Sequence, residues 1–181
     1  MTRDEALELV RSKVKNKNLV KHMLATEACM RGLARHFNED EDFWGITGLV
    51  HDLDYDQTAK DFSKHGFLSA QMLEDMDVDE RIVYAVKAHT GHVETRSVMD
   101  KALFAVDPLT GLIVAATLMH PTKKIKDVDT GFVLNRFKEK RFAAGANRDT
   151  IRTCENIGLS LEEFITISLD AMKTIADELG F

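Results

Sequence analysis

The sequence predicts a single all-α domain. Apolar residues recur at helical spacing along almost the whole chain, and no alternating strand pattern persists. Only two prolines occur, and the ten glycines stand mainly at the ends of predicted elements. The chain has no linker, low-complexity segment or internal repeat, and its 181 residues are enough for one domain with a sizeable core. We therefore expect one compact multi-helix bundle over residues 1–181.

The apolar periodicity predicts a series of helices and places each helix end to within a few residues. In chain order they cover about 3–15, 18–37, 41–53, 64–75, 79–89, 97–118, 129–139, 147–156 and 160–178. The clearest loop runs from Pro121 to Asp129, where lysines and aspartates interrupt the pattern.

Signals at helix ends support several of these boundaries. Ser160 and Glu163 have the spacing of a capping box for the last helix. Asp79 and Ser97 are candidate N-caps for the two helices that they precede. The glycines that could end helices are Gly91, Gly145 and Gly180.

Composition and charge narrow the class of protein. Hydrophobic residues make up 44% of the chain and charged residues 30%, as in an ordinary globular protein. The formal net charge of −6 argues against nucleic acid or an anionic membrane as the main partner. The apolar stretch 102–119 is interrupted by Asp107, Pro108 and Gly111, so we expect it not to span a bilayer.

The N-terminus and the cysteines suggest where the protein works. The first five residues, MTRDE, are charged from the start and do not resemble a signal peptide. Cys29 and Cys154 lie far apart without a CxxC motif, which is typical of inert thiols in a reducing compartment. We therefore expect a cytoplasmic protein.

Four ligand-type residues fall on apolar-periodic segments. His22 shares a helical stripe with small and apolar residues, His51 and Asp52 end the helix predicted over 41–53, and Asp107 interrupts an apolar run. Polar side chains at such positions need a reason to be buried. Metal binding is one reason. The alternatives are a structural core histidine for His22, an exposed helix end for His51 and Asp52, and a buried ion pair for Asp107.

Nearby glycines and a proline should shape the site. Gly45 and Gly48 lie on the same side as Asp52, so a second helix could approach them closely. Gly111 follows Asp107 by one turn and is expected to allow similar packing. Pro108 should disturb the helix around Phe104, whose carbonyl loses its donor.

The remaining histidines differ in their surroundings. His65 and His89 stand at predicted helix ends on partly apolar faces, where either could be a ligand or merely a cap. His92 lies in a turn, and His36 and His120 are expected at the surface.

The ordered set His22, His51-Asp52 and Asp107 resembles the HD superfamily of metal-dependent phosphohydrolases. The resemblance covers about residues 18–117, with the C-terminal helices at about 129–178 outside it. The segments Lys64-His65-Gly66 and Ala88-His89-Thr90-Gly91 resemble the two-metal branch of that family. The chain departs from some relatives in having Leu53-Asp54-Tyr55 after the pair, without a lysine, and it lacks the paired histidines of the cyclic-dinucleotide branch.

The resemblance implies a metal centre and a set of roles. His22, His51, Asp52 and Asp107 would hold one divalent ion, and His65 and His89 a second, with Asp52 bridging. Such imidazole and carboxylate ligands suit Mn, Fe, Co, Ni or Zn, and Mg with more waters. Asp52 and Asp54 are the candidate catalytic residues: Asp54, or its neighbour Asp56, could position the attacking water or protonate the leaving group.

Phosphate would need cationic or N–H donors in addition to the metal. The candidates are Lys64, the Thr90-Gly91 turn, and the cluster of Lys123, Lys124, Lys126 and Arg136 on or beside the long loop. Such a charge run is also typical of a solvated face. No phosphate-cradling glycine-rich loop is present, so nothing suggests an ATP-driven reaction.

The leading functional hypothesis is a phosphohydrolase of a nucleotide or another small phosphate ester or anhydride. One alternative, also implied by the resemblance, is a di-iron oxygenase. Another is a non-catalytic module that binds a metal or a nucleotide. The expected partner is a small phosphorylated substrate, with neither nucleic acid nor membrane. The apolar stripe of the helix at about 160–178 could serve core packing or a homodimer.

Overall fold

The computed structural model describes residues 1–181 and contains helices and turns but no strand. The α-helices are α1 (Arg3–Lys13), α2 (Lys17–Phe37), α3 (Glu41–Val50), α4 (Tyr55–Thr58), α5 (Phe67–Glu74), α6 (Glu80–Ala88), α7 (Val98–Met119), α8 (Thr130–Lys138), α9 (Arg148–Arg152), α10 (Leu161–Thr174) and α11 (Ala176–Leu179). Three 3₁₀ helices lie between them: η1 (Phe62–Lys64), η2 (Ile125–Asp127) and η3 (Thr153–Ile157). The predicted all-α class is confirmed.

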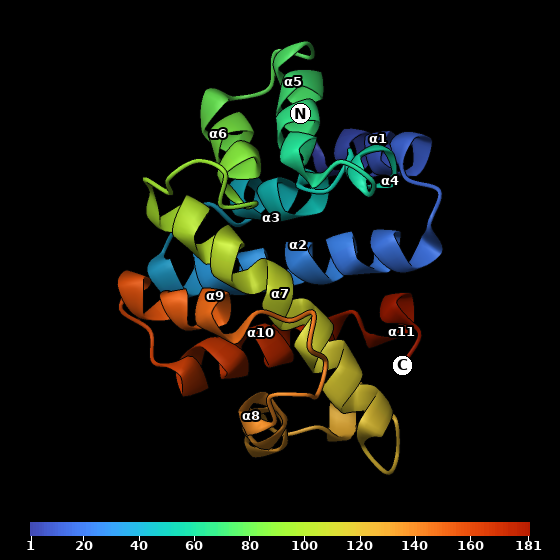
Figure 1. The fold of residues 1–181 in the computed structure, drawn as a ribbon, viewed down its shortest axis with the longest axis vertical. Coiled ribbons are helices and arrows are strands. Elements are labelled where there is room, and N and C mark those ends of the chain that lie inside the picture. Colours follow the sequence, from blue (N-terminus) through green and yellow to red (C-terminus); the bar gives the residue numbers. More distant parts are fainter.

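Helix α2 runs through the middle of the molecule. It packs against α3 on one side and against α7 and α10 on others (Figure 1). In that view α1, α3, α5 and α6 lie above α2, while α8, α9 and α10 lie below it. One cluster of 46 buried residues runs from Ala6 to Leu179, so the C-terminal helices share their core with the central helices. This arrangement puts the C-terminal end of α3 near the first half of α2 and the middle of α7.

The sequence located most of the helices and several of their caps. Ser97 and Ser160 each form a capping box, and the side chain of Asp79 accepts a hydrogen bond from the N–H of Arg81. The short elements α4, η1 and η2 were not predicted, because one or two turns carry no periodic signal. The segment predicted as one helix over 147–156 divides into α9 and η3.

Two glycine predictions were wrong. Gly145 ends no helix, because α8 already stops at Lys138 and α9 begins only at Arg148. No atom lies within 4 Å of a Cβ built on Gly111, so this glycine serves no close helix contact. Helix α7 continues through Pro108 without interruption. The core packed around α7 supports the helix where one backbone hydrogen bond is lost.

The prediction for Gly48 is correct. A Cβ added there would lie 2.8 Å from the carbonyl oxygen of Thr26 on α2. The absence of a side chain therefore lets α3 approach the backbone of α2 directly. This contact holds the end of α3, and with it His51, against α2.

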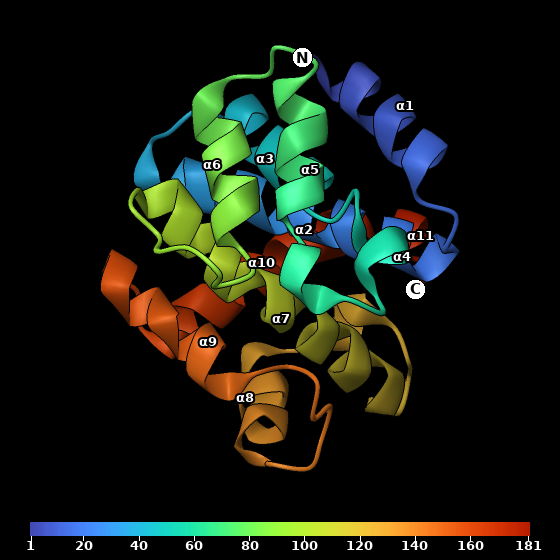
Figure 2. The same cartoon turned by 45° about the horizontal axis from the view of Figure 1, so that its top comes forward.

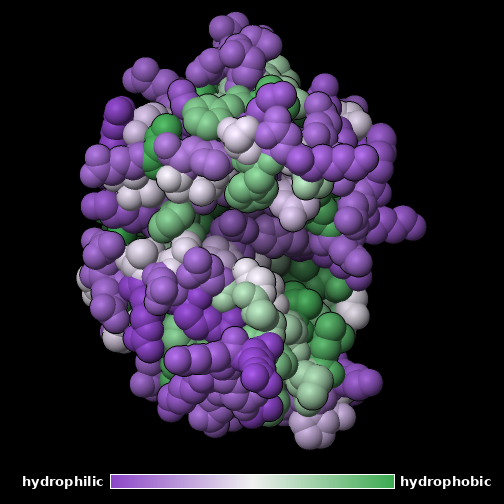
Figure 3. Space-filling model, viewed as in Figure 1, coloured by the Kyte–Doolittle hydropathy of each residue, from purple (hydrophilic) through white to green (hydrophobic).

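Helix α7 has the length and hydropathy of a membrane span, yet in this fold it is a core helix. An 18-residue stretch of this helix has a mean hydropathy of 1.8, and 56% of that stretch is buried inside the protein. Its second half carries an exposed apolar end, where Leu118 and Met119 are 53% and 62% exposed. Figure 3 shows hydrophobic residues gathered over this part of α7 on an otherwise largely hydrophilic face.

The C-terminal stripe and the cysteines are internal. The apolar stripe of α10, including Phe164, Ile165 and Leu169, is buried in the chain's own core. Cys29 and Cys154 are both free and buried. Burial raises the pKa of the Cys29 thiol to about 12 and that of Cys154 to about 11, which keeps both protonated and unreactive near neutral pH.

Candidate metal centre

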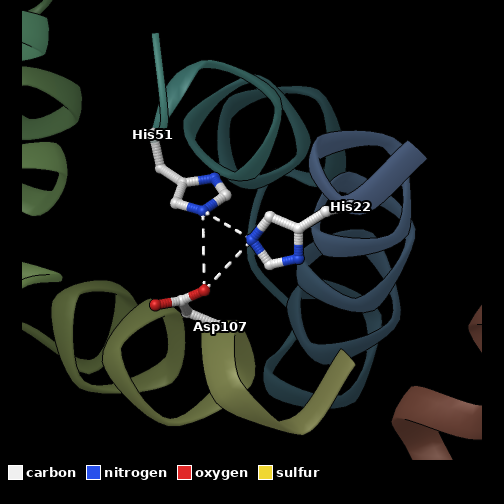
Figure 4. A group of neighbouring side chains, drawn as sticks. All are labelled: His22, His51 and Asp107. Carbon is white, nitrogen blue, oxygen red and sulfur yellow. Dashed lines mark hydrogen bonds and ion pairs between the residues drawn. The ribbon is translucent and has the colours of Figure 1, made fainter. Parts of the chain in front are cut away.

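Three helices bring His22, His51 and Asp107 together. His22 lies on α2, His51 is the C-terminal cap of α3, and Asp107 lies in the middle of α7 (Figure 4). The Nε2 atom of His22 lies 3.2 Å from Nε2 of His51 and 3.1 Å from Oδ1 of Asp107. The third side of this triangle, from His51 Nε2 to Asp107 Oδ1, measures 3.7 Å. These atoms are close enough to share one cation.

The carboxylate of Asp52 joins this triangle to a second group of ligands. Its Oδ2 lies 3.5 Å from Nε2 of both His22 and His51. Its Oδ1 faces the other way and lies 3.3 Å from Nε2 of both His65 and His89. The side chain of Asp52 therefore stands between two pairs of histidines, one pair at each oxygen.

His22, His51, Asp52, His65, His89 and Asp107 together form the candidate metal centre, called the centre below. Each of its four histidines has a partner for Nδ1 outside this group. His51 donates from Nδ1 to the carbonyl of Gly48 at 2.8 Å, and His89 donates to the carbonyl of Val86. Because a carbonyl can only accept, these rings carry their proton on Nδ1 and turn the lone pair of Nε2 toward the centre. This tautomer is the one that a metal ion requires.

The other two rings are held by side chains. His65 donates from Nδ1 to Oδ1 of Asp54 at 2.7 Å. The Nδ1 of His22 lies 2.9 Å from the hydroxyl oxygen of Thr110, which itself donates to the carbonyl of Asp107 at 2.9 Å. The Thr110 proton is thus already engaged, so the hydroxyl accepts from His22 and leaves Nε2 of this ring free as well.

Buried atoms at the centre lack ordinary partners. Asp52 Oδ1 and His89 Nε2 are both buried and make no hydrogen bond, although they face each other at 3.3 Å. Buried polar atoms without partners are costly, so their convergence on one point needs an explanation. A divalent cation held by these residues would satisfy both atoms at once, and the imidazole and carboxylate donors suit it chemically.

The charges of the centre favour a cation there. Burial alone would lower the pKa of His51, but the negative charges of Asp52 and Asp107 outweigh it and raise this pKa to about 9. The pKa of His65 is likewise raised to about 9, against its burial, by Asp52 and Asp54. Contacts with the surrounding histidines hold the pKa of Asp52 well below its ordinary value despite burial. Positive charge is therefore strongly favoured at this point, whether as protons or as metal.

Three of these histidines also lie at the C-terminal ends of helices. His51 and His89 cap the C-terminal ends of α3 and α6, and His65 follows the end of η1. The partial negative charge at the C-terminal end of an α-helix such as α3 or α6 favours a cation close by.

Asp54 and Asp56 differ in burial and in the groups that they contact. Asp54 is fully buried, and its two oxygens accept hydrogen bonds from His65 Nδ1 and from the N–H groups of Gly66 and Ser69. The sequence hypothesis put Asp54 or Asp56 beside the attacking water. The geometry instead puts Asp54 behind His65, as a residue that positions a ligand. Asp56 is exposed and accepts from the N–H of Lys15.

The centre is open on one side. The side chains of His22 and Asp107 are 23% and 32% exposed, whereas those of His51, Asp52, His65 and His89 are at most 5% exposed. A molecule from solvent therefore meets His22 and Asp107 first.

The candidate phosphate ligands make contacts of their own in this structure. Lys64 is 65% exposed and pairs with Asp61 at 3.1 Å. Lys123 and Lys124 are exposed in the loop beyond the end of α7, and that end lies roughly 18 Å along the helix axis from Asp107. Thr90 uses its hydroxyl to donate to the carbonyl of Lys87. Within the cluster of charges, Arg136 pairs with Glu139.

The sequence hypothesis did not identify Thr110 as a partner of the site. A signal was present, because Thr110 follows Asp107 by three residues and so lies near it on the same helix. What the sequence could not show is that His22, 88 residues earlier, faces this hydroxyl.

The sequence profile of the HD domain matches residues 19–129, which is more than half of the chain. The chain belongs to the HD domain family. HD domains are in general metal-dependent phosphohydrolases, and the His and Asp cluster of this HD domain could hold such a metal.

Two curated relatives are similar over nearly the whole of this HD domain protein. Ribonuclease Y of Sulfurovum sp. (strain NBC37-1) is 27% identical over 168 residues, which is 91% of this chain and 33% of the relative. Ribonuclease Y of Desulfotalea psychrophila (strain LSv54 / DSM 12343) is 23% identical over 169 residues, again 91% of this chain and 32% of the relative. The chain thus spans about a third of the length of these relatives. No solved structure matches it significantly.

Proposed function

We propose that this HD domain is a phosphohydrolase that acts on a nucleotide or another small phosphate ester or anhydride through a metal-activated water. The observation that carries the proposal is the position of Asp52, with one oxygen 3.5 Å from Nε2 of His22 and His51 and the other 3.3 Å from Nε2 of His65 and His89. A carboxylate shared in this way between two ligand groups is typical of a two-ion site. A pair of divalent ions supplies Lewis acidity and a bound water of lowered pKa.

The chain's own residues prepare the site for an anionic substrate. Asp52, Asp54 and Asp107 are the carboxylates of the centre, and two divalent ions would outweigh their charge. The centre would then attract phosphate even though the chain as a whole has a net charge of −6. The buried side chains on the far side exclude water, which strengthens each charge interaction in the site.

The open side determines how substrate would approach. Phosphate reaching the centre from solvent passes His22 and Asp107, the two partly exposed ligands. The ring of His22 is held by Thr110, so the more accessible histidine is also fixed in its orientation. Such fixed ligands lose little entropy when metal and substrate bind.

A second candidate function is cleavage of RNA, because both curated relatives are named ribonuclease Y. This chain covers only about a third of each relative, and its negative charge does not favour a long polyanion. A small phosphate ester is therefore the first choice. The two are separated by comparing a mononucleotide with a short RNA as substrates of the manganese-loaded protein.

Metal content and phosphate release together test the proposal. Protein purified without chelator and without affinity nickel is reloaded with manganese, and metal per chain is measured by elemental analysis. We expect one or two equivalents, together with phosphate release from at least one ester in a screen. Asp52→Asn should lose both. His36→Ala is the control, because His36 is exposed and takes no part in the centre. Absence of metal in the wild type, or full hydrolysis by Asp52→Asn, would overturn the proposal.

A further inference from the structure

One side of helix α7 is not fully covered by the rest of the protein. Between Phe104 and Leu118, the residues that are not buried recur at helical spacing and so fall on a single stripe. They are Phe104, Asp107, Pro108, Gly111, Val114, Ala115 and Leu118. Asp107, a ligand of the candidate metal centre, is the one polar residue among them. We call the last four of these residues the apolar strip.

The stripe is closed before Asp107 and open after it. A Cβ built on Gly91 would lie 3.3 Å from the ring of Phe104, so the loop that follows α6 lies against this end. After Asp107, no atom lies within 4 Å of a Cβ built on Gly111. Figure 2 shows the second half of α7, in olive, below α4 and with no other helix drawn in front of it.

The apolar strip begins one helical turn from the centre. Along the axis of α7, Gly111 lies about 6 Å beyond Asp107 and Ala115 about 12 Å beyond it. Asp107 is also one of the two ligands that a molecule from solvent meets first. A group attached to a phosphate at the centre would therefore lie over the strip if it extends toward the C-terminal end of α7.

The chemistry of the strip favours an apolar group at this position. Its side chains are a hydrogen atom, an isopropyl, a methyl and an isobutyl group, which neither donate nor accept hydrogen bonds. A sugar would gain no polar partner from them. An alkyl chain lying on the strip would be removed from water on one side, which is favourable in proportion to the apolar area covered.

Gly111 supports a ligand at this place. A glycine inside a helix is less stable than an alanine there, and Gly111 allows no close contact with another helix. Its missing side chain instead keeps the surface open directly beside the metal ligand Asp107. Glycine at this position is what the close approach of a substrate chain would require.

The strip is too small for a stable protein interface. Such an interface takes about 800 Å² and roughly 20 to 30 residues from each partner. The strip is one helix wide and offers four residues, of which one has no side chain. Its size suits a single narrow chain.

We propose that the apolar strip binds the alkyl chain of an amphiphilic phosphate ester whose phosphate is held at the centre. The inference rests on the proposed function, because it assumes that phosphate binds there. It narrows the substrate to phosphate esters that carry an apolar chain. An extended chain of ten carbons is about 12 Å long, so it would reach from Asp107 to Ala115, whereas a chain of six carbons would end before Ala115.

The test measures binding of methyl-, hexyl- and decylphosphonate to the manganese-loaded full chain by calorimetry, below the concentrations at which they aggregate. Phosphonates carry the chain on a P–C bond, so they report binding without hydrolysis. Full burial of a methylene would tighten binding about four-fold, so we expect about two-fold per methylene on an open strip, or about 30-fold from methyl to hexyl. Decylphosphonate should bind more tightly still. Treatment with EDTA should abolish the binding of all three.

A charge placed on the strip tests its position. Ala115→Asp should weaken decylphosphonate roughly ten-fold, because the chain would cover a hydrated carboxylate, and should leave methyl- and hexylphosphonate nearly unchanged. Retained methylphosphonate binding also shows that this variant is folded. Ala115→Leu should keep tight decylphosphonate binding, because it keeps the strip apolar.

The matched control is Val98→Asp. Val98 is 44% exposed on the same helix, about 13 Å before Asp107 and on the opposite side of α7. This variant introduces the same charge at a similar distance from the centre. It should leave all three phosphonates unchanged.

The alkyl chain could belong to a free ester or to a lipid in a bilayer. Cosedimentation of the manganese-loaded protein with vesicles of phosphatidylcholine and phosphatidic acid, weakened in Ala115→Asp, would assign it to a lipid. Binding of decylphosphonate without cosedimentation would assign it to a free ester. Both results support the strip.

The remaining outcomes separate the strip from the proposed function. Affinity that rises with chain length and falls in Ala115→Asp, without hydrolysis of any ester, would support the strip and remove the phosphohydrolase. Equal affinities of the wild type for the three phosphonates would overturn the strip without needing any variant, and hydrolysis of short esters would then leave the phosphohydrolase intact. A chain-length dependence that persists after EDTA or in Ala115→Asp would also overturn it, since the chain would then bind elsewhere.

Discussion

The hydroxyl oxygen of Thr110 lies 2.9 Å from Nδ1 of His22, and donates to the carbonyl of Asp107 at the same distance. One small side chain thus connects two residues of the candidate metal centre that come from different helices. Because its proton is directed to a carbonyl, the hydroxyl can only accept from His22. This contact fixes the tautomer of the most exposed histidine in the centre.

Thr110→Val should weaken metal binding. Valine keeps the shape of threonine but cannot accept from His22, so the ring is free to rotate or to change tautomer. We expect a loss of about 10- to 100-fold in metal affinity, measured by competition with a chromophoric chelator. Thr110→Ser is the control, because it keeps the hydroxyl and should bind metal nearly as well as the wild type. Equal affinities for Thr110→Val and the wild type would show that the contact does not orient His22.

Asp54→Asn should affect one metal position more than the other. The substitution removes the charge that His65 faces at 2.7 Å, so His65 becomes a weaker ligand while His22 and His51 keep their partners. We expect one equivalent of manganese to be lost or weakened in elemental analysis after dialysis.

Asp56→Asn provides the comparison for this experiment. Asp56 lies two residues further on, is exposed and contacts the N–H of Lys15 instead of a metal ligand. The Asp56→Asn variant should retain the wild-type metal content. If the two variants lose metal equally, the positioning role of Asp54 is wrong.

Gly48→Ala and Gly111→Ala should change stability in opposite directions. A Cβ at Gly48 would lie 2.8 Å from the backbone carbonyl of Thr26, so α3 must shift away from α2. We expect a loss of about 1–3 kcal/mol in the free energy of unfolding, measured by urea denaturation. Gly111 has no atom within 4 Å of its Cβ position and lies inside α7, so alanine there should stabilise by up to about 1 kcal/mol.

Manganese should raise the melting temperature of the wild type. Any ligand that binds only the folded state stabilises it by about 2.7 kcal/mol at a hundred times its Kd. Differential scanning fluorimetry with and without manganese, after treatment with EDTA, measures this shift. Asp52→Asn should show little shift, because the carboxylate that both pairs of histidines face loses its charge. A shift of the same size in that variant would mean that the stabilising ion binds elsewhere.

The amino-acid sequence by itself determined the helical class and most helix boundaries, and its resemblance to the HD superfamily supplied the six candidate ligands. These follow from local rules: apolar spacing marks helices, capping residues mark their starts, and polar side chains on apolar segments mark buried sites. The pattern of His22, His51-Asp52 and Asp107 also indicated the family, which the match over residues 19–129 confirms.

Only the tertiary structure decided what depends on the approach of distant segments. The contact of Thr110 with His22 spans 88 residues, and the position of Asp54 behind His65 depends on the turn between α4 and α5. The errors for Gly111 and Gly145 have the same origin, because a glycine reveals where a close approach is allowed but not whether a neighbour is there. The two-sided position of Asp52 arises in the same way, since His22, His65 and His89 come from three other segments that meet it only when the helices pack.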